Sequence, residues 1–200
     1  MSGEQPATGG DLWALAAATE SATALLAAVE GRAGHSPQRA RDVSALAVAV
    51  GRSLGLDAGR LSNLEWSARL HDIGMLGVPA EILSKPGALD AAERAEMHKQ
   101  AEIAERIVSS TPEVSHLARG IRAGHERWDG TGYPDGLRGN EIPIISRIVY
   151  VCDAYYAMTS ERPYRQQPLT PAEGRAELER HAGTQFCPTV VEAALTVLNG

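Results

Sequence analysis

Apolar residues recur at spacings of three and four along most of this chain, the period with which an α-helix buries one face. The first such stripe lies in residues 11–30, where Asp11 can cap a helix and Gly31 can end it. We therefore predict a helix over 11–30. The pattern fits a packed core helix and a connector helix that pairs two copies of the chain equally well.

Local start signals place the helices that follow. Ser36-Pro37 and Thr111-Pro112 each put a proline in a first helical turn, and Asp90-Ala-Ala-Glu93 and Thr170-Pro-Ala-Glu173 are capping-box patterns. The predicted helices cover residues 36–54, 57–72, 90–109, 111–126, 143–159, a segment from 170, and 188–199.

One stretch interrupts the helical pattern. Residues 125–137, HERWDGTGYPDGL, have glycine or proline at every second position from 130 to 136, which neither a helix interior nor a central strand tolerates. We predict a long loop over 129–143. Its glycines let the backbone turn tightly and approach a ligand, and its proline stiffens the turn.

Length and composition fit one helical domain with an appendage. The chain has 200 residues, 44% of them hydrophobic, with a single Phe and abundant Ala, which favours closely packed helices over a β-sandwich. We therefore predict the all-α class. The expected organisation is a disordered lead over 1–10, a connector helix over 11–30 and one domain over 31–200.

The charge balance excludes a general attraction to DNA, RNA or an anionic membrane. The formal net charge is −6, so an anionic ligand would need a local basic patch. Of the 19 basic residues only Lys85 and Lys99 are lysine. Nearly all the positive charge is therefore carried by arginine, the better bidentate clamp for phosphate.

Cysteine usage and hydropathy indicate a cytoplasmic protein. Cys152 and Cys187 lie 35 residues apart without a CxxC motif, so neither a disulfide framework nor a zinc knuckle is predicted. No apolar run reaches the roughly 18 to 20 residues that cross a bilayer, and no basic segment precedes a hydrophobic stretch at the N-terminus.

Polar residues occupy two apolar helices. His71 and Asp72 lie side by side at the end of one, and Asp153 interrupts another with no Lys or Arg four residues away. A buried carboxylate costs several kcal/mol unless it is paired. A His–Asp hydrogen bond that joins two helices would satisfy this need, and so would a metal ion.

Further histidines extend this set: His35 precedes a predicted helix, His98 lies within one, and His125 begins the glycine loop. Imidazole and carboxylate ligands without cysteine suit Mn, Fe, Zn or Mg. A carboxylate can also bridge two ions about 3.5 to 4 Å apart, an arrangement used in phosphoryl chemistry. The residues alone leave open whether these side chains converge.

Two motifs resemble those of a known family. His71-Asp72-Ile-Gly74 resembles the HD motif of the HD phosphohydrolase superfamily, and residues 125–134 resemble the HHExxDGxGYP motif of its HD-GYP subfamily. The resemblance covers roughly residues 35–195. Other matching positions follow in family order: Lys85-Pro-Gly87, His98, Glu141-Ile-Pro143, Asp153 and residues 159–165.

The resemblance implies an all-α domain whose metal centre hydrolyses cyclic di-GMP, often to GMP, by attack of a metal-activated hydroxide. By matching position, His35, His71, Asp72 and Asp153 would bind one metal, and Asp72 would bridge to a second held also by His98. Fe or Mn is favoured, and Mg, Zn or Ni would also be compatible with these ligands.

The same resemblance implies a cyclic dinucleotide as the ligand. Tyr133 of the glycine loop, together with Arg162 and Arg165, would contact its phosphates and bases. We also expect a homodimer through residues 11–30 and a signalling partner protein at the glycine loop.

Three positions depart from the family pattern. Met75 replaces the Lys expected at the scissile phosphate, Gly124 replaces the first His of the HH pair, and Gly31 replaces a Glu that holds a third metal in some members. We therefore expect one well-held metal and a weaker second. His125 is a candidate ligand, although neither it nor His116 occupies the missing position.

The departures leave three functions to compare. The first is a cyclic di-GMP phosphodiesterase with weakened activity. The second is a catalytically degenerate module that binds cyclic di-GMP or a partner protein. The third, an HD hydrolase of another nucleotide, explains the metal residues but leaves the glycine loop unused.

Overall fold

A computed structural model describes residues 23–27, 37–160 and 167–199. Within these ranges the chain is helical and has no β-strand, only an isolated bridge between Ala182 and Phe186. The predicted all-α class is confirmed. The predicted lead over 1–10 and most of the predicted helix over 11–30 lie outside the described residues.

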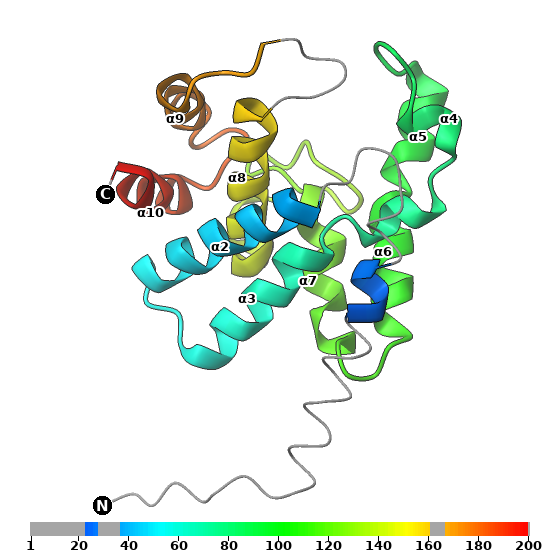
Figure 1. Cartoon of the computed structure of the whole chain (residues 1–200), viewed down its shortest axis with the longest axis horizontal. Coiled ribbons are helices and arrows are strands. Elements are labelled where there is room, and N and C mark those ends of the chain that lie inside the picture. The colour runs from blue at the N-terminus through cyan, green and yellow to red at the C-terminus, as the bar shows by residue number, and fades with distance from the viewer. Residues whose placement is uncertain (1–22, 28–36, 161–166, 200) are drawn as a thin grey trace, which may run out of the picture.

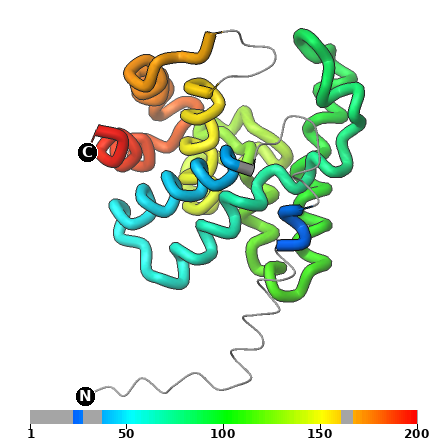
Figure 2. The backbone as a smooth tube through the Cα atoms, in the orientation of Figure 1, coloured from blue at the N-terminus to red at the C-terminus, as the bar shows by residue number. Residues whose placement is uncertain are grey.

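The helices follow one another along the chain, and residues 126–138 form a long loop between η3 and η4 (Figures 1 and 2). Their bounds are α2 Pro37–Ser53, α3 Ala58–Leu70, η1 Ile73–Gly77, α4 Ala80–Leu83, α5 Ala91–His98, α6 Gln100–Ser109, η2 Ser115–Leu117, α7 Ala118–Arg122, η3 Ala123–His125, η4 Gly139–Glu141, α8 Ile144–Thr159, α9 Pro171–Arg180 and α10 Pro188–Asn199.

Two predicted helices are wrong in detail. The segment 90–109 forms two helices, α5 and α6, which are divided at Lys99, where φ is −62° and ψ is −16°. The segment 111–126 forms only the short pieces η2, α7 and η3. Gly120 and Gly124 lie in this segment, and glycine is a poor helix former.

Two hydrophobic clusters hold the helices together. The larger joins α2, α3, α8 and α10, with Val43, Leu64, Ile148 and Val190 all fully buried. These helices form the centre and one side of the molecule in Figure 1, and α4, α5 and α6 lie on the opposite side. Each fully buried aliphatic side chain contributes about 1.5–3 kcal/mol of transfer free energy.

The smaller cluster lies around the end of α3. It contains Leu70, Ile73, Val108 and Ile121, and Leu26 of the described turn 23–27 packs into it. Leu70 and Ile73 are fully buried on either side of His71-Asp72. The predicted metal residues at this point are therefore fixed by core packing on both sides.

Gly74 allows α6 to pack directly against this segment. A Cβ at position 74 would lie 1.9 Å from the carbonyl oxygen of Gln100, well inside van der Waals contact. The two backbones therefore touch, and a side chain at this position would force them apart. Gly124, in contrast, has nothing within 4 Å of an added Cβ.

We expect Gly74→Ala to lower the free energy of unfolding by about 2–3 kcal/mol because the methyl group overpacks a rigid backbone contact. The matched control, Gly124→Ala, should change it by less than about 1 kcal/mol. Urea denaturation followed by circular dichroism measures both. Equal effects of the two substitutions would contradict the close contact at Gly74.

Candidate functional site

His71 is held in one orientation by its own helix. Its Nδ1 lies 2.7 Å from the backbone carbonyl oxygen of Ala68, and its side chain is only 9% exposed. An Nδ1–H that donates to a carbonyl leaves the Nε2 lone pair for another partner, as in many metal-binding histidines.

Nε2 of His71 faces two carboxylates from different parts of the chain. It lies 3.1 Å from Oδ2 of Asp72 and 3.3 Å from Oδ1 of Asp153, which α8 supplies. Nε2 is buried and forms an aligned hydrogen bond with neither. The structure thus brings together three of the residues that the sequence singled out.

A fourth residue, Arg39 of α2, completes this cluster. Its Nη2 donates to Oδ1 of Asp153 at 2.5 Å, and both side chains are largely buried. The sequence analysis did not predict this contact because the two residues are 114 positions apart. Only the packing of α2 against α8 brings them together.

The charges in the cluster depend on one another. Burial opposes a charge on His71, but Asp72 and Asp153 outweigh it and raise the pKa of the imidazole well above its ordinary value. Burial likewise opposes ionisation of Asp153, yet His71 and Arg39 hold the pKa of that carboxyl below its ordinary value. The carboxylates are therefore neutralised here by an imidazolium and a guanidinium.

His98 and His125 lie beside this cluster and stack on Tyr133. The ring centroid of Tyr133 is 3.8 Å from that of His98 and 5.1 Å from that of His125, with nearly parallel planes. Burial lowers the pKa of both histidines below the ordinary value, which favours the neutral form that stacks on a ring or ligates a metal. His125 also interacts electrostatically with Asp72.

The nitrogen and carboxylate donors suit a divalent metal chemically, and the buried Nε2 of His71, which has no aligned hydrogen bond, would ligate one after losing its proton. Their present arrangement is not that of a formed metal centre. Among the described residues, no group of three or more His, Cys, Asp or Glu side chains could hold a metal ion as it stands. His35 lies outside the described residues.

The hydroxyl of Tyr133 is fixed by a residue that the sequence did not indicate. Nε2 of Gln100 donates to this hydroxyl at 2.8 Å, and Gln100 is 4% exposed at the start of α6. Burial raises the pKa of Tyr133 above its ordinary value. The phenol therefore stays protonated at neutral pH.

Polar contacts, one of them from the buried Glu126, hold the glycine loop in place. Oε1 of Glu126 accepts the backbone N–H of Asp135 at 2.7 Å, and Glu126 is 2% exposed. Arg122 donates to both carboxylate oxygens of Asp135 at 2.7 Å each and also to Glu105. Gly132 is required because an added Cβ would lie 2.4 Å from the backbone nitrogen of Arg127.

Asp129 closes the start of the same loop. Its carboxylate accepts from the Arg127 guanidinium and from the backbone N–H and hydroxyl of Thr131, at distances between 2.6 and 3.3 Å. Hydrogen bonds from Arg127 hold the pKa of this carboxyl far below its ordinary value.

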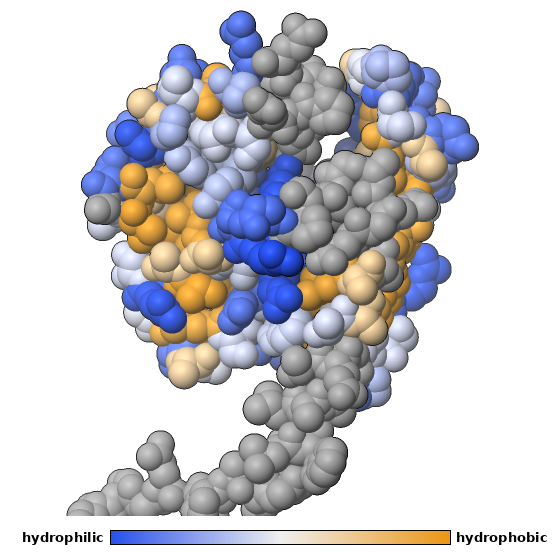
Figure 3. Space-filling view, viewed as in Figure 1, coloured by the Kyte–Doolittle hydropathy of each residue, from blue (hydrophilic) through white to orange (hydrophobic). Residues whose placement is uncertain are grey.

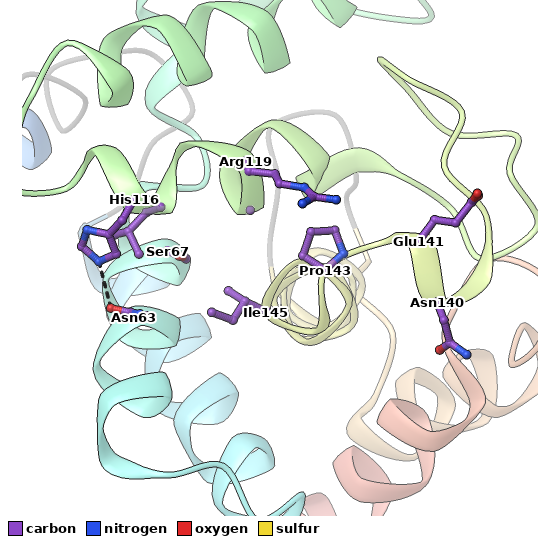
Figure 4. Close-up of a pocket in the computed structure, with 10 residues that line it drawn as sticks. Asn63, Ser67, His116, Arg119, Asn140, Glu141, Pro143 and Ile145 are labelled. Carbon is purple, nitrogen blue, oxygen red and sulfur yellow. Dashed lines mark hydrogen bonds between the residues drawn. The ribbon is translucent and has the colours of Figure 1, made fainter.

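The remaining sequence candidates fall into two groups. Arg162 and Arg165 lie outside the described residues. His116 lies away from the cluster, where it hydrogen-bonds to Asn63 at 3.0 Å in a cavity of about 360 Å³ between α3, α7 and α8 (Figure 4). It therefore cannot supply the ligand that is missing at Gly124.

A helical domain with an adjacent His-Asp pair at a helix end, opposed by an aspartate of another helix, is an HD-type domain. The family model described as "HD domain" matches residues 24–190. The chain belongs to the HD-domain family, in its HD-GYP branch.

Relatives and a solved structure are consistent with this family. A "Cyclic di-GMP phosphodiesterase" of Thermotoga maritima is 40% identical over 148 residues, which are 73% of this chain and 40% of that protein. A "3'3'-cGAMP-specific phosphodiesterase 2" of Vibrio cholerae is 35% identical over 170 residues, 84% of this chain and 32% of that protein. The chain thus spans less than half the length of either.

The fold is also that of an HDG"Y"P protein, Bd1817, from Bdellovibrio bacteriovorus, with a TM-score of 0.68 at 20% identity. That match covers 95% of this chain and 63% of the other.

The HD phosphohydrolase superfamily is metal-dependent, so a divalent metal is the cofactor that fits the family. None of the described helices has the length and apolarity to span a membrane.

Asp129 gives the stability of this protein a defined pH dependence. Its pKa is depressed by folding, so the carboxylate stabilises the fold above its unfolded pKa of about 3.9, and this contribution is lost as the pH falls toward the folded value. We expect Asp129→Asn to lower the free energy of unfolding by about 1 kcal/mol at pH 7. The difference from the wild type should shrink below about pH 4.

Urea denaturation at pH 7 and pH 3 measures this difference. Asp42→Asn, which removes a carboxylate from a surface contact with Gln38, is the matched control. If the difference in free energy of unfolding between Asp129→Asn and the wild type is the same at both pH values, Asp129 does not have the depressed pKa that we assign to it.

Proposed function

We propose that this chain is a divalent-metal-dependent phosphodiesterase that hydrolyses cyclic di-GMP. The observation that carries the proposal is the buried imidazole of His71 between the carboxylates of Asp72 and Asp153, next to the anchored glycine loop. The names of the Thermotoga maritima and Vibrio cholerae relatives support a cyclic dinucleotide as the substrate.

The proposed metal ligands are those expected from the family. His71, Asp72 and Asp153, with His35, would hold the first ion, and Asp72 with His98 would hold a second, for which His125 is a further candidate. Fe or Mn is the favoured metal. When bound, such an ion supplies Lewis acidity and lowers the pKa of water so that hydroxide is available at neutral pH.

The chain's own residues bind and orient the substrate. Because Gln100 donates to the hydroxyl of Tyr133, the phenolic proton is left to donate to a phosphate oxygen. Arg162 and Arg165 are proposed to bind the phosphates as well. The loop that carries Tyr133 is held by the carboxylate of Glu126, so this donor is already positioned before the substrate arrives.

A second candidate function is supported by specific positions. Met75, which replaces the expected Lys, has no charge and donates no hydrogen bond, and Gly124 supplies no ligand. A domain with these changes could bind a cyclic dinucleotide or a partner protein at the glycine loop without turnover. The Vibrio cholerae relative also makes 3'3'-cGAMP a substrate to test.

We expect Asp72→Ala to reduce cyclic di-GMP hydrolysis by about a thousandfold or more because it removes the carboxylate that both proposed ions share. Purified chain is incubated with Mn²⁺ or Fe²⁺ and cyclic di-GMP, and the products are separated by chromatography. Asp42→Ala is the matched control and should retain activity. Tight binding of cyclic di-GMP by an inactive wild type would support the binding module instead.

The two departures from the family pattern are tested by reversing them. We expect Met75→Lys combined with Gly124→His to raise the rate by about a hundredfold because a cationic donor and a metal ligand are both restored. The open space around Gly124 allows the larger side chain. If the double variant folds and binds metal but is no faster than the wild type, these two positions do not limit activity.

A further inference from the structure

A groove with three arginines lies between α2 and α3, outside the proposed catalytic cluster. Its volume is about 500 Å³. Figure 3 shows hydrophilic and hydrophobic side chains next to one another over α2 and α3. The groove is lined by Arg41, Ser44, Ala45, Val48, Arg52, Glu65 and Arg69.

Five arginines elsewhere in the described residues form ion pairs, whereas Arg41 and Arg52 are among the described arginines that form none. Arg39, Arg122 and Arg127 each form an ion pair with a carboxylate. Arg41 and Arg52, which are exposed, form none with any residue that the structure describes. The groove therefore presents guanidinium groups that are available to an external anion.

Arg69 adds a third cation from the opposite helix. Its guanidinium carbon lies 4.8 Å from the ring centroid of Trp66, a cation–π contact that limits its orientation. Glu65 is the one acid that lines the groove, so the lining carries a formal charge of +2 from three arginines and one glutamate. The whole chain, in contrast, has a net charge of −6.

The positions of the arginines in the groove limit which ligands could contact more than one of them. Arg41 and Arg52 are 11 residues apart on one face of α2, a separation of about 16 Å along a helix. Ser44 and Ala45 between them are small, which leaves room for a ligand. The cations thus lie toward the two ends of the groove and on both of its walls.

We propose that this groove binds a small anion that carries several phosphate groups. Guanidinium groups match phosphate oxygens with paired hydrogen bonds, and a cavity of about 500 Å³ is within the size range of small-molecule sites, about 300–1,000 Å³. A folded protein partner fits less well because stable protein interfaces use about 20–30 residues on each side, and seven line this groove.

The residues that line this groove include none of the proposed catalytic cluster, although α2 and the end of α3 contribute to both. Arg39, which binds Asp153, precedes Arg41 by two residues, and Arg69 precedes His71 by two residues. The inference does not depend on the proposed phosphodiesterase activity.

Tripolyphosphate is the probe for this site, titrated into EDTA-treated protein by isothermal calorimetry. Arg41→Gln and Arg52→Gln should each weaken binding about tenfold, the effect of losing one charge-assisted hydrogen bond. Arg106→Gln, the same change at an exposed position of α6, should leave the affinity unchanged. The binding should also change Trp66 fluorescence, a signal that Trp66→Phe removes.

Several outcomes would overturn the proposal. These are no measurable binding to the folded wild type, or equal affinities of the Arg41→Gln and Arg106→Gln proteins. A hexaglutamate peptide that binds as tightly as tripolyphosphate would overturn the assignment to phosphate. Circular dichroism confirms that each variant is folded.

Discussion

The structure depends on neutralising two largely buried carboxylates that lie where the end of α3 meets α8. Removing an ionised carboxylate from water costs several kcal/mol even after the protein relaxes, so Asp72 and Asp153 cannot stay charged without cations nearby. His71 and Arg39 provide them, at 3.1–3.3 Å and 2.5 Å respectively. This need for positive charge is also what makes the cluster suitable for a divalent ion, which delivers two charges at one point.

The sequence correctly predicted those helix starts whose capping residues all lie within one helical turn. Asp90 and Glu93 form the capping box that their spacing indicated, and so do Thr170 and Glu173. The division at Lys99 was not predicted, because it follows from tertiary packing: Gln100 at the start of α6 is buried and reaches Tyr133. Helical periodicity does not show where a helix changes direction in response to its neighbours.

The candidate site was also predicted only in part, because the local sequence does not show contacts between distant segments. His71, Asp72 and Asp153 were noticeable as polar residues in apolar helices, and they do meet. Arg39, Gln100 and Glu126 were missed. An arginine near a helix start or a glutamate before a loop resembles a solvated side chain, and only contacts between distant segments give these residues their roles.

The glycine loop shows that fold and catalytic capacity depend on different residues. Its shape rests on Gly132, where a side chain would collide with backbone, and on Glu126, which accepts a backbone N–H from the far side of the loop. Neither Met75 nor Gly124 takes part in these contacts, and an added Cβ at Gly124 would meet open space. Changes at these two positions can therefore alter the chemistry of the site while the loop and the helices around it keep their arrangement.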